Sequence, residues 1–381
     1  MTAAIAPTSV FSTATRAARE HAAVNLAQGA PDFDPPEALV SAAVDALASG
    51  RSQYSLSEGL PELREAIAAH VREQHGVVYS PDDEVTVTVG ATEAIWSTVA
   101  ALVAPGDEVV LVEPFYELYR AAVLAAGGRC RYVRTTFPRF CLDLDQLATA
   151  FSPRTRLVVV NTPGNPSGRL LTAVEAAALG ALAERHDAAV LSDETYEHIV
   201  FAGRHVPVAT DPACRPRTIT VSSISKTFSA TGWRVGWALA APGLTAALRA
   251  THQHVTFAAA TPLQAAVAAT LDAAAPSGYL VALRRAYAQR REVLAAALDR
   301  LGFETPRPDG GFFLTVGVQG DERAFCRRLL HEAGVAALPG SAFHAPGAPT
   351  PGFVRFAFCK RVETLKEAGA RIVAALGQGA R

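Results

Sequence analysis

The chain has 381 residues, of which 50% are hydrophobic and 19% charged, a composition typical of a folded globular protein and too apolar for a disordered one. At about 150 residues per domain, this length predicts two or three domains. Lys and Arg number 35 against 36 Asp and Glu, a formal net charge of −1, which disfavours a nucleic-acid binder because that class usually carries a basic excess.

The cysteines and the N-terminal residues indicate the cellular compartment. There are five cysteines, and none forms a C-x-x-C pair, so we expect reduced thiols and neither a disulfide scaffold nor a metal site. The first residues lack the basic and apolar segments of a signal peptide. No apolar run reaches the roughly 18 residues of a membrane span. We therefore expect a cytoplasmic protein.

Predicted strands and helices alternate through the middle of the chain. Strands are expected over 85–89, 108–112, 129–134, 157–160, 188–191 and 218–221. Helices are expected over 93–103, 117–126 and 172–186, with a turn at 90–92 before the first of them. Thr172 and Glu175 have the spacing of a capping box at the start of the third helix. The alternation predicts an α/β fold with a mostly parallel sheet covered by helices on both faces.

The pattern changes after Pro276. Helices are expected over 279–301 and 321–333 and from Val362 onward, and strands over 312–318 and 353–358. This order is typical of a second, smaller α+β domain. We accordingly expect an N-terminal arm over 1–36, a large domain over 37–277 and a small domain over 278–381.

Polar residues at the ends of the predicted strands are the candidates for a ligand site, because ligands of such sheets bind there. Asp193 follows one strand, although a carboxylate there also suits a helix cap. Asn165 lies in a loop over 161–168 that prolines stiffen, which an elaborate turn would also explain. Residues 90–92 precede a helix, where free N–H groups suit a phosphate, although a glycine before a helix is common.

The segment over 222–234 is the most specific. Lys226 follows a strand among small hydroxyl residues, and Ser223 and Arg234 can hold a phosphate beside it. Arg355 lies within an apolar strand, where a charge needs a partner. That partner is either an internal carboxylate or the carboxylate of a ligand bound by the planar guanidinium. Together, these residues predict an aromatic aldehyde phosphate held by a lysine beside a carboxylate substrate.

With these motifs in their order, the chain resembles the class I/II aminotransferase family of fold-type I pyridoxal-phosphate enzymes. The similarity is greatest to the branch that contains kynurenine, glutamine, methionine and succinyl-diaminopimelate transaminases. It runs from residues 25–33, Asn-Leu-Ala-Gln-Gly-Ala-Pro-Asp-Phe, to residues 355–360, Arg-Phe-Ala-Phe-Cys-Lys. The resemblance implies the fold of that family, with a large domain and a smaller C-terminal domain.

The resemblance also implies the roles of individual residues. Lys226 would bond covalently to the cofactor aldehyde and later move the substrate's α-proton. Asp193 would pair with the pyridine nitrogen, Asn165 and Tyr196 would bind the ring oxygen, and Tyr116 would stack on the ring. The phosphate would be held by Ala91, Thr92, Ser223 and Arg234, and by Tyr54 of a neighbouring subunit. The substrate would meet Gly29, Asn165 and Arg355, and Phe257 of the neighbouring subunit.

These assignments imply a homodimer with shared active sites, in which the arm covers the substrate. The expected reaction moves the amino group of an L-amino acid to a 2-oxo acid. Val10, Phe11 and Phe257 favour aromatic, methionine or glutamine-like side chains, while N-succinyldiaminopimelate fits the same pattern. Gly164, Ala30 and Ala258 depart from the family pattern at positions that bear on specificity.

Two other interpretations remain. The same cofactor supports a β-lyase, a cyclase, or an amino-acid oxidase or hydroxylase of a biosynthetic pathway. An aminotransferase-like half of a transcription regulator would need an added winged-helix domain, for which the sequence leaves no space.

Overall fold

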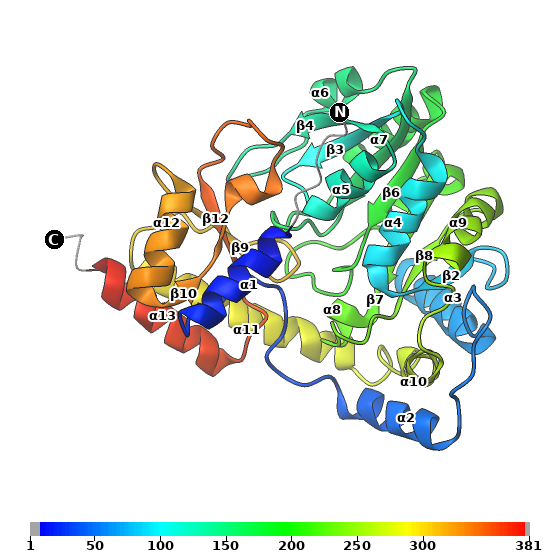
Figure 1. Ribbon diagram of the computed structural model, residues 1–381, viewed down its shortest axis with the longest axis horizontal. Helices are drawn as coiled ribbons and strands as arrows, with labels where there is room; N and C mark the ends of the chain where they lie inside the picture. The colour runs from blue at the N-terminus through cyan, green and yellow to red at the C-terminus, as the bar shows by residue number, and fades with distance from the viewer. Residues whose placement is uncertain (1–7, 378–381) are drawn as a thin grey trace.

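A seven-stranded sheet forms the centre of the large domain in the computed structural model, which describes residues 8–377 (Figure 1). Its strands are β2 (Val85–Thr88), β3 (Glu108–Glu113), β4 (Arg129–Arg134), β5 (Thr155–Asn161), β6 (Ala189–Asp193), β7 (Thr218–Ser223) and β8 (Gly236–Leu239). Their order is β2-β8-β7-β6-β5-β3-β4. Only β8 runs against its neighbours. The predicted α/β class with a mostly parallel sheet is confirmed.

Helices cover both faces of this sheet because side chains alternate along each strand. Val109, Leu111 and Val159 pack with α4 (Gly90–Leu102) and α5 (Glu117–Ala125) on one face. Val110 and Val158 pack with α6 (Leu144–Ala150) and α7 (Ala173–Arg185) on the other. The remaining helices of this domain are α2 (Glu37–Ala48), α3 (Pro61–His75), α8 (Ile224–Thr227), α9 (Pro242–Val255) and α10 (Thr261–Leu271).

The small domain is built on a three-stranded antiparallel sheet in the order β11-β12-β9. Its elements are α11 (Tyr279–Asp299), β9 (Phe313–Gly317), α12 (Glu322–Arg328), β10 (Val335–Ala336), β11 (Leu338–Pro339), β12 (Phe353–Ala357) and α13 (Val362–Leu376). Helix α11 packs along α13 and leads from the large domain into the small one (Figure 1). The α+β character expected of this region is confirmed.

The N-terminal residues lie against the small domain. Helix α1 (Val10–Glu20) is followed by β1 (Val24–Asn25), which pairs in parallel with β10. Farther along, Ala357 donates its N–H to the carbonyl of Leu26 at 2.7 Å. The helix buries Ala18 in a cluster with Phe343 and Leu338 of the small domain. No helix within residues 8–377 combines the length and the apolar composition needed to cross a membrane.

Several boundaries differ from the sequence prediction. The turn expected at 90–92 is wrong, because Gly90 already begins α4. The helix expected over 321–333 changes at Leu329 into a wider π-type turn. The capping box of Thr172 and Glu175 is confirmed at the start of α7. The helices that were not predicted are α1, α2, α3, α6, α8, α9 and α10, and the strands that were not predicted are β1, β8, β10 and β11.

Candidate active site

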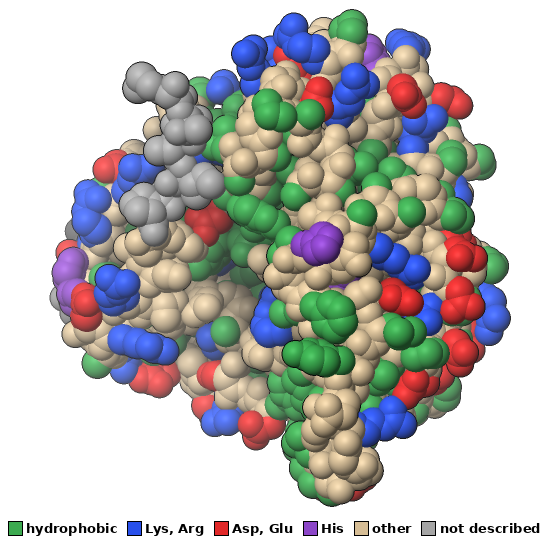
Figure 2. Space-filling model, turned by 45° about the vertical axis from the view of Figure 1, so that its right-hand side comes forward, with side chains coloured by type: hydrophobic (Ala, Val, Ile, Leu, Met, Phe, Trp, Pro, Cys, Tyr) green, Lys and Arg blue, Asp and Glu red, His purple; other side chains and the backbone are tan. Residues whose placement is uncertain are grey.

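A cavity of about 390 Å³ opens at the carboxyl ends of β5, β6 and β7, beside α1 and the small-domain sheet. Figure 2 shows a hollow between the small domain, on the left, and the large domain, with hydrophobic side chains gathered along it. The predicted site residues that line the cavity are Gly29, Ala91, Thr92, Tyr116, Asn165, Asp193, Tyr196, Ser223, Lys226, Arg234 and Arg355. These residues are separated by up to 326 positions in the sequence, and the fold brings them together.

One end of the cavity has the donors of an anion site. Ala91 and Thr92 lie in the first turn of α4, where backbone N–H groups are free and the helix dipole favours negative charge. Gly90 has φ of +72°, and a Cβ there would lie 2.4 Å from a guanidinium nitrogen of Arg234. Ser225, on α8, has a buried hydroxyl without a hydrogen-bond partner. An unsatisfied hydroxyl, a guanidinium and helix N–H groups together fit a phosphate.

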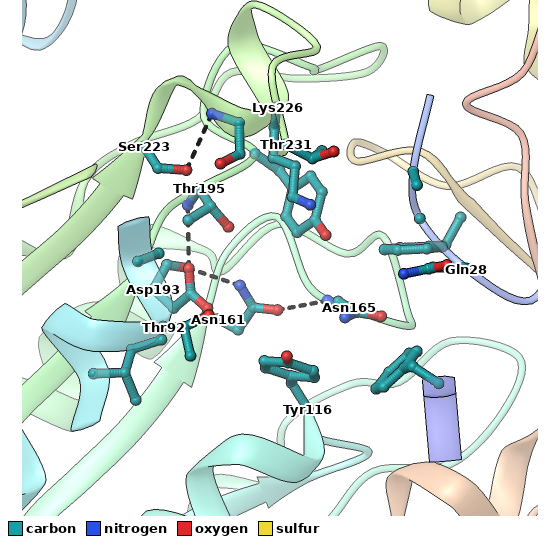
Figure 3. Close-up of a pocket in the computed structure, with 18 of the residues that line it drawn as sticks. Gln28, Thr92, Tyr116, Asn161, Asn165, Asp193, Thr195, Ser223, Lys226 and Thr231 are labelled. Carbon is teal, nitrogen blue, oxygen red and sulfur yellow. Dashed lines mark hydrogen bonds between the residues drawn. The ribbon is translucent and has the colours of Figure 1, made fainter. Parts of the chain in front are cut away.

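Lys226 lies at the centre of the cavity, on the short helix α8 that follows β7 (Figure 3). Its Nζ is 5.2 Å from the ring centre of Phe312 and 5.8 Å from that of Tyr196. Burial among these rings disfavours the ammonium form and lowers the pKa of Lys226 to about 8. A larger fraction of this amine is therefore neutral and nucleophilic near neutral pH than for an exposed lysine.

Asp193 is buried at the last position of β6. Its carboxylate accepts the hydroxyl of Tyr119 at 2.6 Å and the N–H of Thr195 at 3.2 Å. Burial raises the pKa of Asp193, while the two hydrogen bonds and the nearby Lys226 act in the opposite direction. The bond to Thr195 holds a turn and caps no helix, because no helix begins between Asp193 and Val208, so the helix cap that the sequence allowed is wrong. The bond to Tyr119 is additional.

Two asparagines connect the backbone of Asp193 to the loop after β5. The side-chain amide of Asn161 donates to the carbonyl of Asp193 at 2.8 Å, and its oxygen accepts the N–H of Asn165 at 2.6 Å (Figure 3). The loop is therefore held by specific bonds from the neighbouring strand end. It places Asn165 next to the small domain, where the Asn165 side chain reaches Arg355.

Arg355 is completely buried in β12 and makes no ion pair among the described residues. Its guanidinium donates to Asn165 Oδ1 at 2.9 Å and to the carbonyl of Ala27, and its Nε has no partner. The internal salt bridge is thus wrong as an explanation of this residue. Burial lowers the pKa of Arg355 to about 9. A buried guanidinium that faces a cavity without a counter-ion suits a ligand carboxylate.

Tyr54 and Phe257 lie outside the cavity of their own chain. Their side chains are 88% and 44% exposed, and the two ring centres are 5.4 Å apart. Val10, expected as a wall of the pocket, also does not line the cavity, whereas its neighbour Phe11 does. The structure therefore separates the predicted site into residues gathered within one chain and two exposed aromatic residues.

Sequence reasoning missed several residues of the cavity. Tyr119, Asn161, Thr195, Ser225 and Phe313 line it without having been assigned a role. The spacing of Tyr116 and Tyr119 gave a signal for one of them, because residues three apart share a face of a helix. No comparable signal marked Phe313, whose place depends on how the two domains pack.

Comparison with known proteins gives a consistent result. The family model described as aminotransferase class I and II matches residues 22–372. The chain is 42% identical to the probable N-succinyldiaminopimelate aminotransferase of Mycobacterium tuberculosis, over 96% of this chain and 95% of that protein. It is 39% identical to the methionine aminotransferase of Escherichia coli, over 96% and 95% of the two chains. The solved structure of N-succinyldiaminopimelate aminotransferase from M. tuberculosis matches with a TM-score of 0.93 and covers 98% of this chain and 100% of that one.

Proposed function

The chain belongs to the class I and II aminotransferase family, whose members depend on pyridoxal phosphate, and we propose that it moves the amino group of an aromatic, methionine or glutamine-like L-amino acid to a 2-oxo acid. The single observation that carries this proposal is the combination of groups in one cavity. Lys226, with its lowered pKa, lies there with the buried carboxylate of Asp193 and the unpaired guanidinium of Arg355.

Pyridoxal phosphate, when bound, supplies an aldehyde that bonds to amines and a ring that accepts electrons as the bond between Cα and hydrogen breaks. We assign its phosphate to Ala91, Thr92, Ser223 and Arg234, and to Ser225 in addition. Its ring belongs with Asp193, Asn165, Tyr196 and Tyr116. Asp193 would hold a proton on the ring nitrogen, and Tyr119 keeps the Asp193 carboxylate in place by its hydrogen bond.

The chain's own residues then act on the amino acid. Arg355, with Asn165 and the N–H of Gly29, binds the α-carboxylate and so fixes the orientation of the groups on Cα. Lys226 would take the proton from Cα as a general base and pass it to the carbon that carried the cofactor aldehyde, and in the second half of the reaction it would move a proton in the opposite direction. The aromatic rings around Arg355 exclude water, which strengthens the attraction between guanidinium and carboxylate.

The lining of the cavity supports a substrate with an uncharged side chain. Lys226, Arg234 and Arg355 are the cations among the described lining residues. Each of them already has a part in this proposal, so none remains for a second carboxylate. Phe11, Ile95 and Ala30 supply apolar surface, and the small side chain of Ala30 leaves room for a bulky group.

N-succinyldiaminopimelate is the second candidate substrate. The similarity to a mycobacterial protein bearing that name favours it. The distal carboxylates of such a substrate would then need cations from outside this chain's own cavity, and a partner subunit is the natural source.

A panel of single amino acids, without an oxo acid, tests the proposal. The enzyme loaded with pyridoxal phosphate is mixed with phenylalanine, methionine, glutamine, kynurenine or N-succinyldiaminopimelate, and the cofactor absorbance is followed. We expect one 2-oxo acid per site, no ammonia and no oxygen uptake, fastest with the apolar side chains. Ammonia release or oxygen uptake would instead identify a lyase or an oxidase. A preference for N-succinyldiaminopimelate would select the second candidate.

We also propose that two chains share their active sites. Tyr54 and Phe257 project from the surface instead of into their own cavity. Exposed Val40, Val44 and Leu47 lie on the nearby helix α2, where Figure 2 shows hydrophobic side chains on the lower protrusion. A second copy covering this region would remove the apolar surface from water and bring both aromatic residues to a cavity. The division of the chain at residues 36 and 277, and its cytoplasmic location, stay predictions.

A further inference from the structure

Helix α1 is connected to the large domain by the carboxylate of Glu117. One carboxylate oxygen accepts the N–H of Val10 at 3.2 Å, and the other accepts the hydroxyl of Ser9. The other described side-chain hydrogen bonds of α1 all stay within the arm. Glu117 also begins α5, so its charge lies at the N-termini of two helices, where negative charge is favourable.

The arm that carries α1 otherwise belongs to the small domain. Strand β1 pairs with β10, the guanidinium of Arg355 donates to the carbonyl of Ala27, and Lys360 donates to the carbonyl of Ala30 at 2.6 Å. The bonds of Glu117 therefore join the small domain to the large one across the mouth of the cavity. They do so at the residue next to Tyr116, which lines that cavity.

Phe11 is the residue that this connection positions. Phe11 is the residue after Val10 in the first turn of α1, and its side chain lines the cavity. The ring meets Tyr116 edge-on at 5.5 Å and Phe343 at 6.3 Å between ring centres. The guanidinium of Arg355 lies 5.3 Å from its centre. The first turn of α1 thus forms the wall that separates Arg355 from water on the side of the arm.

We infer that Glu117 is a positioning residue for the substrate. By capping α1 it holds Phe11 against Tyr116 and Arg355, which keeps water from the guanidinium and strengthens its bond to a carboxylate. The inference rests on the proposed function for the identity of that carboxylate as an amino acid. It requires no contact between Glu117 and the substrate or cofactor.

Three variants and one control test this inference. Glu117→Ala removes both acceptors, and Glu117→Gln keeps one acceptor without the charge. Ser9→Ala removes the donor to Glu117 together with the oxygen that accepts the N–H of Phe11 at 3.2 Å. Thr13→Ala is the matched control, because it also removes a hydroxyl from the first turn of α1 but has no bond to Glu117. Thermal unfolding of each variant establishes that it is folded. Should Glu117→Ala fail to fold, Glu117→Gln and Ser9→Ala carry the test.

Two measurements need no turnover. Hydrogen exchange reports opening of the first turn of α1, and titration with 3-phenylpropanoate, a carboxylate without an amino group, reports on Arg355. We expect faster exchange in Glu117→Ala and a dissociation constant raised about fivefold, as loss of a helix cap allows. The changes in Glu117→Gln are smaller. KM for the amino acid rises in parallel while kcat changes little. The double variant of Glu117→Ala and Ser9→Ala adds less than the Ser9→Ala change alone, because only the cap of the Phe11 N–H is still there to lose.

The results separate this inference from the proposed function. Exchange in α1 that stays at the wild-type rate in Glu117→Ala overturns the inference, and so does faster exchange with unchanged 3-phenylpropanoate binding. An effect of Thr13→Ala as large as that of Ser9→Ala overturns it as well. Absence of amino-group transfer in the wild-type enzyme defeats the proposed function only, because exchange and 3-phenylpropanoate binding still report on Glu117.

Discussion

Arg355 shows how a single residue can point to a ligand. It lies in the middle strand of the small-domain sheet, surrounded by Phe11, Phe313 and Phe343. A guanidinium cannot lose its charge readily even there, since the pKa falls only to about 9. Under the proposed function a substrate carboxylate would offset the cost of burying that charge, so bound substrate would stabilise the folded protein.

Replacing Arg355 by Lys tests this role. The variant keeps a positive charge but loses the planar pair of donors, so we expect 3-phenylpropanoate binding to weaken by about 1–3 kcal/mol. Arg290→Lys is the control, because Arg290 also lies over aromatic rings, those of Phe33 and Tyr287, but outside the cavity. Equal affinities for the wild type and Arg355→Lys, measured by calorimetry, would rule out the assignment.

The lowered pKa of Lys226 has a consequence for cofactor binding. The neutral amine bonds to an aldehyde and the ammonium does not, so the rate of cofactor incorporation follows the neutral fraction. For apoenzyme mixed with pyridoxal phosphate, we expect the rate to rise with pH and to level off above about pH 8. An ordinary lysine would still be gaining rate near pH 10. Stopped-flow absorbance from pH 6 to 10 measures this, with Lys226→Ala as the blank.

At the scale of elements, the site depends on how β8, α4 and the segment around Arg234 meet. The backbone of Gly236 in β8 approaches Gly90 and Ala91 so closely that a Cβ would lie 2.7 Å from the carbonyl carbon of Gly90. Arg234 itself has a positive φ of 55°, an unusual conformation for a residue with a side chain. The two glycines allow the guanidinium to lie against the start of α4.

Gly90→Ala should therefore damage the proposed phosphate site. The new methyl group would collide with the Arg234 guanidinium and would also have to adopt φ of +72°, which costs about 1 kcal/mol or more. We expect faster loss of pyridoxal phosphate on dialysis, with the far-UV spectrum of the wild type. Gly76→Ala is the control, because it has a similar φ of +74° but no atom within 4 Å of its Cβ. Equal cofactor retention in the two variants would contradict the prediction.

At the scale of the whole molecule, the exposed aromatic pair of Tyr54 and Phe257 lies outside the cavity of its own chain. A heterodimer experiment tests whether it acts in a partner. Subunits with Lys226→Ala are mixed with subunits with Tyr54→Ala and refolded together. One of the two sites in the mixed dimer then has both native residues, so activity should rise above that of either variant alone. No recovery, with mixed dimers demonstrated by mass spectrometry, would place Tyr54 outside the shared site.

A buried group of histidines makes the stability of the whole molecule depend on pH. His70 and His198 share a hydrogen bond of 2.8 Å between their Nε2 atoms, and His75 bonds to Glu197 at 2.7 Å. Burial lowers the pKa of His198 to about 3 and also lowers that of His70. The bond to Glu197 outweighs burial for His75, whose pKa is raised. The cluster thus joins α3 to the segment that carries Asp193 and Tyr196.

The sign of the pH dependence follows from these shifts. An unfolded histidine takes up a proton near pH 6.5, whereas folded His198 stays neutral down to about pH 3. The free energy of unfolding should therefore decrease as the pH is lowered below 6.5. This residue contributes a decrease of up to about 1.4 kcal/mol per pH unit. His75 acts in the opposite direction. Urea unfolding at pH 7 and 5 should show a weaker pH dependence for His198→Gln, but an unchanged one for the exposed control His254→Gln.

The sequence by itself determined the α/β class, the order of most elements and the chemistry at the strand ends. These properties are local: alternating strands and helices, the capping box at Thr172 and the polar residues after β5, β6 and β7 are all written in short segments. The resemblance then named Lys226, Asp193 and Arg355 together, and the cavity contains all three.

Tertiary structure alone decided which interpretation of each residue holds. Whether Arg355 has an internal carboxylate partner depends on segments hundreds of residues away, and packing leaves it without one. The positions of Tyr119 against Asp193 and of Glu117 against α1 depend on how separate elements and domains meet. Local sequence patterns do not predict these contacts, because contacts between residues far apart in the sequence depend on how whole elements and domains pack.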